Sequence, residues 1–200
     1  MEKSNIEILK AFAKSTNRSI FYEEIPYPAK GYRSIQRYKS MIYIPNNSEK
    51  NIYFVWFSDP YAKIGLPTIY CGAFIPLPLE NKTKLNIRNK NIIDRLNVFS
   101  KTKSKEIGNI HFDSKVIISG DIDSSMKKFL TQRNIQIQLI KALEIEPFIN
   151  ISFNENYIDF IPEFKDTPYL SILNPLNWCT ESHEIEKIFR EAEKIRALIG

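Results

Sequence analysis

Glycine is scarce in this sequence, and the phosphate-binding loops that depend on it are missing. Only 6 of the 200 residues are glycine. None of them belongs to a G-x-x-x-x-G-K-[ST] or G-x-G-x-x-G pattern, in which glycine backbone cradles a nucleotide phosphate. The H-E-x-x-H pattern of zinc proteases and the G-x-S-x-G pattern of serine hydrolases are also missing. The sequence therefore disfavours nucleotide-dependent enzymes and offers no known catalytic signature.

Cysteine is equally scarce, since the chain has only 2. Cys71 and Cys179 are far apart in sequence, so they indicate no disulfide framework, and we expect both thiols to be reduced. Cys179 and His183 are one helical turn apart, but a structural zinc site needs four ligands, normally in two tight pairs. A Cys and His nucleophilic pair would also need a third group to orient it. We therefore expect no metal and no cofactor, and interpret Cys179 as a small buried residue.

Three aspartates and a second histidine are the remaining candidates for chemistry. Asp113, Asp121 and Asp123 lie close enough in sequence to suggest a divalent-cation loop. The EF-hand pattern fails, however, because Gly120 precedes the acids and no Glu stands at the twelfth position of the loop. Helix capping explains Asp121 and Asp123 more simply. His111 has apolar neighbours on both sides, so it is predicted to lie on a strand face rather than to act as a general base.

Long apolar runs are missing as well. The most apolar window, residues 64–79, contains three prolines and is shorter than the roughly 20 residues that a membrane helix needs. The N-terminal segment carries charges in its first turns and lacks the continuous apolar stretch of a signal peptide. We therefore expect a cytoplasmic protein without a transmembrane segment.

The chain does contain enough apolar surface to fold by itself. Hydrophobic residues make up 43% of the sequence and aromatic residues 12%, and disordered chains lack such surface. A chain of 200 residues suits one continuous core. Residues 1–200 are therefore predicted to form a single domain.

The N-terminal half predicts one helix followed by an antiparallel sheet. Ser4 and Glu7 fit a capping box, and apolar residues recur on one face of the segment that follows. Runs of β-branched and aromatic residues then alternate with turn-rich segments, at 20–22, 35–44, 52–57 and 68–75. Aromatic residues 53, 54, 56 and 57 could form a stacking platform for single-stranded nucleic acid. Large side chains on both strand faces favour a doubly buried strand instead.

The C-terminal half predicts a strand, a pair of helices and a last helix. A strand over 115–118 precedes a helix capped by Asp121 or Asp123, and Thr131 is expected to cap a second helix. The last helix begins near Glu181 and carries a long apolar stripe. These elements predict an α+β fold, a mainly antiparallel sheet with the helical pair and both terminal helices packed on it.

Residues 149–161 predict a β-hairpin between the helical pair and the last helix. Apolar residues alternate from Ile149 to Phe153, residues 154–156 suggest a turn, and a strand pattern resumes at Tyr157. The hairpin should belong to the core sheet and bury four side chains, those of Ile151, Phe153, Ile158 and Phe160.

The stretch 112–162 contains an F-x-x-x-V strand, an Asp-led helix, a Leu-Thr step into a second helix and an I-x-I-S-F hairpin. This series resembles a bacterial family known only as a domain of unknown function. The TIYCGAFIPL segment at 68–77 is similar to the strand that leads into that family's central loop. In the family the soluble domain often follows membrane-spanning helices, and no catalytic residue carries over. The resemblance implies structural positions only: Val116 in a strand, Leu130 in a helix core, Thr131 as a helix cap, and Ile151 and Phe153 facing inward.

A basic and partly loop-like segment at 81–106 is the one feature that points to a function. The chain has a formal net charge of +5, and a later stretch of the chain is acidic. One interpretation is a solvated loop that keeps the protein soluble. The other is a surface for an anionic partner. We call the following eight residues the basic segment: Lys82, Lys84, Arg88, Lys90, Arg95, Lys101, Lys103 and Lys105.

These observations predict a non-enzymatic interaction or accessory module in a bacterial cytoplasm, with another protein as its partner. Two alternatives stay open. One is an anion-binding module that engages nucleic acid or an acidic membrane surface through the basic segment. The other is an unrecognised hydrolase, which would need a pocket that gathers His111, His183 or the acidic residues.

Overall fold

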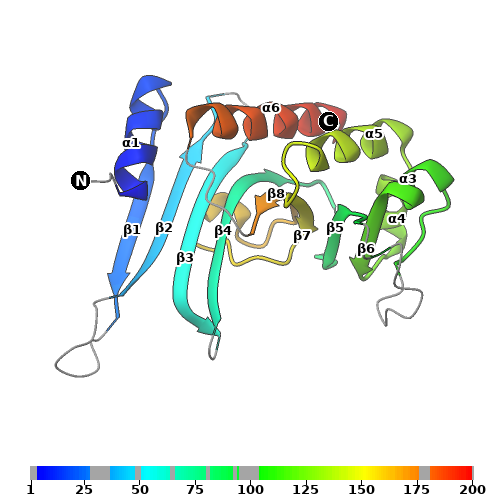
Figure 1. Ribbon diagram of the computed structural model, residues 1–200, viewed down its shortest axis with the longest axis horizontal. Coiled ribbons are helices and arrows are strands. Elements are labelled where there is room, and N and C mark those ends of the chain that lie inside the picture. The colour runs from blue at the N-terminus through cyan, green and yellow to red at the C-terminus, as the bar shows by residue number, and fades with distance from the viewer. Residues whose placement is uncertain are drawn as a thin grey trace.

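Within the residues that the computed structural model describes, eight strands form one antiparallel sheet (Figure 1). In chain order they are β1 (Phe21–Pro26), β2 (Tyr38–Pro45), β3 (Tyr53–Lys63), β4 (Leu66–Pro76), β5 (Leu85–Asn89), β6 (Val116–Gly120), β7 (Asn150–Phe153) and β8 (Tyr169–Asn174). In space the order is β1-β2-β3-β4-β8-β7-β5-β6, and every neighbouring pair is antiparallel. The structure describes residues 4–27, 37–47, 51–63, 66–79, 82–91, 94, 104–175 and 181–199. The predicted α+β class with a mainly antiparallel sheet is confirmed.

Three longer helices cover one face of this sheet. They are α1 (Asn5–Ser15), α5 (Arg133–Leu143) and α6 (Ser182–Ile199). Figure 1 shows α5 and α6 along the upper side of the sheet and α1 above β1 and β2. Two short helices, α3 (Ile110–Lys115) and α4 (Ser124–Leu130), lie beside β6, and a single 3-10 turn, η1 (Pro162–Phe164), precedes β8.

The first helix begins as its sequence predicts. The Ser4 hydroxyl accepts a hydrogen bond from the Glu7 backbone N–H at 3.3 Å, and the Glu7 carboxylate accepts one from the Ser4 N–H at 2.9 Å. This reciprocal pair satisfies two backbone donors that the first turn would otherwise leave open. Leu9, Phe12 and Ala13 then face the sheet and are buried.

Strand β3 divides the interior into two cores, because its successive side chains point to opposite faces of the sheet. Phe54 and Trp56 pack into the core beneath the helices, which we call the helix-side core. Tyr53, Val55 and Phe57 pack into a second core on the other face, which we call the loop-side core. Residues 154–168 cover the loop-side core with three buried side chains, those of Ile158, Ile161 and Phe164. The doubly buried strand predicted here is confirmed.

The predicted hairpin at 149–161 is wrong, although most of its burial is right. Strand β7 pairs with β8, with Asn150 opposite Leu173 and Phe153 opposite Leu170, and residues 157–161 form no strand. Asn154 ends β7 in a left-handed conformation with φ of 54°. The chain then crosses the loop-side face before it returns as β8. Of the four side chains expected to be buried, Ile151, Phe153 and Ile158 are buried and Phe160 is half-buried.

Two local assignments also differ from the sequence-based expectation. Thr131 does not cap α5. It ends α4, where its hydroxyl donates to the Lys128 carbonyl at 3.0 Å, and Gln132 precedes α5 without a side-chain cap. His111 does not lie on a strand, because the side chain of Asn109 accepts hydrogen bonds from the N–H groups of His111 and Phe112 and starts α3. The strand was predicted because Asn109 was not identified as a helix cap. The chain forms a short helix at this place instead.

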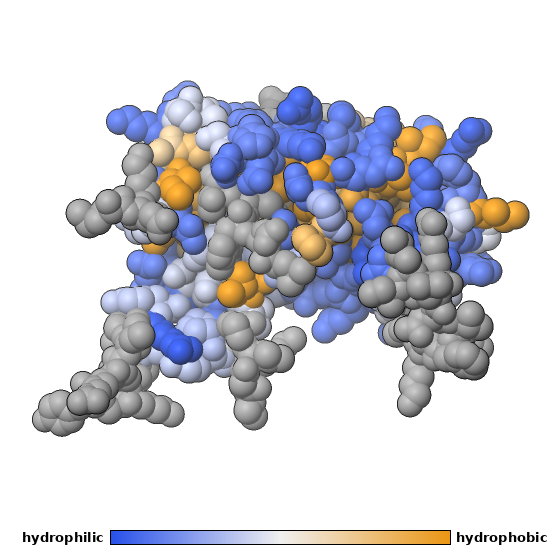
Figure 2. Space-filling view, in the orientation of Figure 1, coloured by the Kyte–Doolittle hydropathy of each residue, from blue (hydrophilic) through white to orange (hydrophobic). Residues whose placement is uncertain are grey.

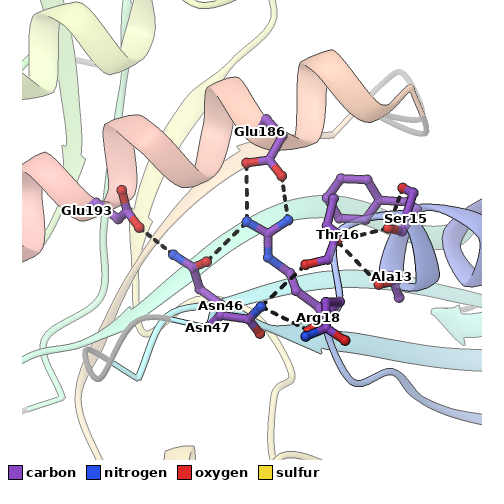
Figure 3. Close-up of polar contacts among 10 residues, drawn as sticks. Ala13, Ser15, Thr16, Arg18, Asn46, Asn47, Glu186 and Glu193 are labelled. Atoms are coloured by element: carbon purple, nitrogen blue, oxygen red, sulfur yellow. Dashed lines mark hydrogen bonds and ion pairs between the residues drawn. The ribbon is translucent and has the colours of Figure 1, made fainter.

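Arg18 joins α1, the β2–β3 connection and α6 (Figure 3). Its guanidinium binds both carboxylate oxygens of Glu186 and, at 3.3 Å, the side-chain oxygen of Asn46. Asn46 in turn donates to Glu193 at 2.6 Å. The same guanidinium lies over the rings of Phe12 and Phe189, at 5.3 Å and 4.9 Å from their centroids. Only 11% of the Arg18 side chain is exposed, so the group acts as a partly desolvated clamp.

Replacing Arg18 with Met is expected to lower the free energy of unfolding by about 1.5–3 kcal/mol, the usual worth of hydrogen bonds to charged groups. Glu186 stays partly solvated, which keeps the loss below that of a fully buried pair. Denaturant titration measures the change. The matched control is Lys115→Met, which breaks the ion pair with Glu144, exposed on both sides, and should cost about 0.5 kcal/mol or less. If the two variants had the same free energy of unfolding, Arg18 would not hold these elements together.

Candidate interaction surface

The described residues of the basic segment lie at the β5–β6 end of the sheet, and part of this stretch is a strand rather than a loop. Leu85 and Ile87 of β5 are buried in the helix-side core, and Arg88 is opposite Ile117 of β6. The alternation is only five residues long, which is too short to stand out from its polar surroundings. The Arg88 guanidinium forms two hydrogen bonds with Asp94, at 2.6 Å and 2.7 Å. These bonds hold the pKa of Asp94 at about 2, so this cation is neutralised inside the protein.

Three lysines of the basic segment line one depression of about 620 Å³. Acidic side chains share it. Lys105 lies 3.5 Å from Asp121, while Lys82 lies 3.6 Å from Asp166. The third lysine that lines the depression is Lys84. Arg95, Lys101 and Lys103 fall outside the described residues. So do Ile92, Ile93, Leu96 and Phe99, whose helical spacing predicts a short amphipathic helix with one apolar stripe.

The aspartates that suggested a cation loop have structural roles. The Asp113 carboxylate accepts hydrogen bonds from three consecutive backbone N–H groups, those of residues 107–109, each at 3.0 Å. Asp123 caps α4 through the Met126 N–H at 2.7 Å, as predicted, whereas Asp121 does not cap a helix. Within the described ranges, no group of three or more His, Cys, Asp or Glu side chains is arranged to hold a metal ion.

The structure does not bring the two histidines together. His111 lines a cavity of about 400 Å³ with Arg133 and Gln136. His183 lies in the first turn of α6, outside that cavity, with Glu181 at 3.3 Å. Cys179 lies outside the described residues, and Cys71 is buried in the middle of β4. Among the described residues, the two histidines therefore do not share a pocket.

A group of exposed aromatic side chains at the β1–β3 end of the sheet was missed by sequence reasoning. Phe21 is 48% exposed, Tyr61 55% and Tyr157 47%. Phe21 stacks on Tyr43 of β2 with ring centroids 4.7 Å apart. Figure 2 shows pale residues, intermediate in hydropathy, gathered at the lower ends of β1 and β2. We call the following residues the aromatic surface: Phe21, Ile25, Tyr27, Tyr43, Tyr61, Tyr157 and Phe160.

A buried carboxylate holds part of the aromatic surface in place. Asp59 is 6% exposed and accepts hydrogen bonds from the Tyr27 hydroxyl at 2.8 Å and the Tyr61 N–H at 2.9 Å. The bond to Asp59 raises the pKa of Tyr27, so this hydroxyl stays protonated and donating. The rings of Tyr27 and Tyr61 meet edge to face, with their centroids 4.7 Å apart. Arg37 lies over the Tyr61 ring at 5.6 Å, which adds a cation to this cluster.

Packed rings form the floor beneath the aromatic surface. Tyr70 stacks on Phe57 with centroids 4.9 Å apart, and its hydroxyl donates to the Tyr157 carbonyl. Burial raises the pKa of Tyr70 well above its usual value. Lys39 lies over the Tyr157 ring at 4.7 Å. The surface rings are therefore attached to a rigid base, and a binding partner would meet side chains that are already ordered.

Strand β1 is the outer strand of the sheet at this end. All six of its residues are exposed, including Phe21, Tyr22 and Ile25. Glu23 and Glu24 make the strand acidic. The aromatic surface thus meets an exposed strand edge that carries two carboxylates.

The chain matches no protein-family model, no curated protein and no solved structure. The family resemblance of residues 68–162 therefore stays a prediction. In the part of the chain that the structure describes, no helix is both long and apolar enough to cross a bilayer.

Proposed function

We propose that this chain is a non-enzymatic binding module that holds a partner protein on the aromatic surface. One observation carries the proposal. Four of the ten large hydrophobic side chains that are exposed in the described residues belong to this one surface: Phe21, Ile25, Tyr61 and Tyr157. Clustered exposed apolar residues mark interaction sites, and tyrosine and phenylalanine are enriched in protein interfaces.

The charges around these rings favour a protein over a nucleic acid. Single-stranded nucleic acid needs a positively charged groove beside its stacking rings. Here Arg37 and Lys39 share the loop-side face with the carboxylates of Asp59 and Glu23. The described residues of the basic segment lie on and beside β5, at the other end of the sheet. The rings and the main cluster of cations therefore do not form one surface.

The test is a selection of binding peptides from a random displayed library on the immobilised protein. A selected peptide should bind the double variant Tyr61→Ser, Tyr157→Ser at least about tenfold more weakly, since interface hot spots cost more than about 1.4 kcal/mol each. The control variant is Ile110→Ser, Ile137→Ser, which removes exposed apolar side chains elsewhere. It should bind as the parent does. Selected peptides that bind all three proteins equally would overturn the proposal.

The anion-binding alternative has a separate test. Lys84 and Lys105 border a depression that an anion could enter, although carboxylates line the same depression. If the alternative holds, binding to anionic liposomes or to nucleic acid should weaken steeply with salt, because each neutralised phosphate releases counterions. Titrations compare the parent with the variant in which residues 84, 90, 101 and 103 are Gln. Loss of lipid binding in Leu96→Ser, Phe99→Ser would indicate a membrane mode, and equal weak binding by parent and Gln variant would exclude both modes.

A further inference from the structure

The two edges of the sheet differ in how their backbone groups are used. At the β6 edge, the Lys105 N–H donates to the Ile118 carbonyl at 3.0 Å, and the Ile118 N–H donates to the Ser104 hydroxyl at 3.1 Å. Residues 104 and 105 therefore cover that edge. At the β1 edge, no strand of the described residues pairs with the outer side (Figure 1). An uncovered edge offers a row of donors and acceptors to another chain.

The hydrogen bond just beyond β1 shows which residues point outward. The Tyr27 N–H donates to the Arg37 carbonyl at 2.9 Å, in the same register that pairs Ile25 with Lys39 and Phe21 with Tyr43. In an antiparallel ladder the residues that bond to one neighbour alternate with those that face away. Residues 21, 23, 25 and 27 therefore bond to β2. Residues 22, 24 and 26 direct their backbone groups outward.

Pro26 fits this alternation. A proline has no N–H, and it is tolerated on an edge strand where that position faces away from the sheet. The outer edge of β1 consequently offers the N–H groups of Tyr22 and Glu24 and the carbonyls of Tyr22, Glu24 and Pro26. A pairing strand would find matched donors and acceptors along the first four residues of β1 and no donor at its end.

The side chains of β1 determine which residue types would fit opposite them in a pairing strand. Phe21 and Ile25 flank Glu23 on the loop-side face of β1, and Tyr22 precedes Glu24 on the helix-side face. Opposite charges across neighbouring strands stabilise a pair, and like charges directly opposite destabilise it. Apolar residues flanking two adjacent cations would therefore complement this edge.

A second copy of the same chain is a poor match. Antiparallel two-fold pairing centred on Glu23 or on Glu24 places that carboxylate opposite its own copy, and pairing centred between them places Glu23 opposite Glu24. Each of these arrangements sets carboxylates side by side. Edge charges of this kind are a known means of preventing self-association through strands.

We propose that β1 accepts an extended, basic segment of the partner protein, which adds to the sheet as a ninth strand. This inference rests on the proposed binding function and names its mode. Main-chain hydrogen bonds to Tyr22 and Glu24 supply the pairing, while the carboxylates of Glu23 and Glu24 select lysine or arginine. The flanking apolar residues of the segment lie opposite Tyr22 and Ile25, and Ile25 belongs to the aromatic surface.

The probe is a short acetylated and amidated peptide, Thr-Val-Lys-Lys-Val-Thr. Its charge-reversed control is Thr-Val-Glu-Glu-Val-Thr. Isothermal titration should show that the parent protein prefers the lysine peptide at least about tenfold. The variant Glu23→Lys, Glu24→Lys should prefer the glutamate peptide. The control variant Glu106→Lys, Glu181→Lys makes the same change of net charge on exposed residues elsewhere and should keep the parent's preference.

Backbone pairing is tested on the peptide, so the result does not depend on whether a β1 variant folds. Two versions of the lysine peptide carry N-methyl groups on alternate amides, one set on each edge of the extended chain. One version should lose binding about tenfold or more and the other should bind as the unmodified peptide does. Equal binding by both versions would overturn strand addition.

The outcomes separate this inference from the proposed function. Peptides selected on the aromatic surface that bind regardless of the charges of Glu23 and Glu24 would leave the binding function standing and overturn the β1 mode. A parent protein that dimerises with rising concentration, and loses this in Tyr22→Pro, would show that a second copy occupies the edge and would also overturn it. If neither charged peptide binds the parent protein, the β1 mode is also overturned.

Discussion

The Gly72→Ala variant is expected to lose its cooperative unfolding transition. Gly72 lies in β4 opposite Leu173 of β8 and has φ of 153°. A Cβ atom at this position would lie 1.9 Å from the backbone carbonyl oxygen of Ile172 and 2.9 Å from the Cα of Leu173. Because both contacts are with backbone, the two strands would have to separate, which places the cost above the roughly 4–5 kcal/mol that marks exceptional substitutions. Thermal unfolding followed by circular dichroism measures the effect.

The matched control for this variant is Gly108→Ala. Gly108 also has a positive φ, of 93°, but an added Cβ would meet no atom within 4 Å. It should cost only about 1–2 kcal/mol from the backbone conformation. A Gly72→Ala protein that unfolds at the same temperature as the Gly108→Ala protein would show that the two strands are not in close contact at Gly72.

The Phe153→Ala variant is expected to lose about 3–5 kcal/mol of unfolding free energy, the usual cost of deleting a buried ring. The Phe153 side chain is fully buried in the helix-side core, where its ring meets that of Phe129 edge to face at 6.0 Å. Denaturant unfolding should show a lower midpoint with little change in slope. Phe148→Ala removes a ring that is 52% exposed and should have a small effect. An unchanged midpoint for Phe153→Ala would contradict its place in the core.

Features that depend on a few neighbouring residues were predictable from the sequence. The Ser4 capping box, the two-faced burial of β3 and the Asp123 cap of α4 each follow from a local pattern. The resulting class, helices on a mainly antiparallel sheet, also follows. These predictions agree with the structure because each local preference supports the same tertiary arrangement.

Strand pairing depends on distant residues, and there the sequence was insufficient. Residues 150–153 carry a strand pattern, but nothing in them says whether their partner comes four residues or sixteen residues later. Strand β8 has a buried residue at every position, so it shows no alternation to separate it from other apolar runs. The apolar residues at 158–164 resemble a returning strand, yet they cover the loop-side core instead.

The interaction surface could not be inferred for a related reason. A local pattern does not show whether a strand lies at the edge or in the middle of a sheet, so the exposed aromatic residues of β1 were read as ordinary strand residues. Tyr27 and Tyr61 each lay in a segment that was expected to be a turn. The available signal was a tyrosine beside a proline near the end of β1 and again near the end of β3.

The position of β8 has a consequence for the order in which the protein is made. This strand is the last of the eight in the chain, yet it lies in the middle of the sheet, between β4 and β7. During synthesis β1–β4 can pair early through local turns, whereas β5, β6 and β7 form a second unit. Until residue 174 has left the ribosome, both units expose an unpaired edge that the finished protein conceals, and such edges favour aggregation. Pairing of β8 with β4 joins residues that are far apart in the chain, such as Cys71 and Asn174, which are 103 positions apart. A non-local step of this kind slows folding. The newborn chain therefore passes through a stage at which chaperone binding to β4 and β7 would be most useful.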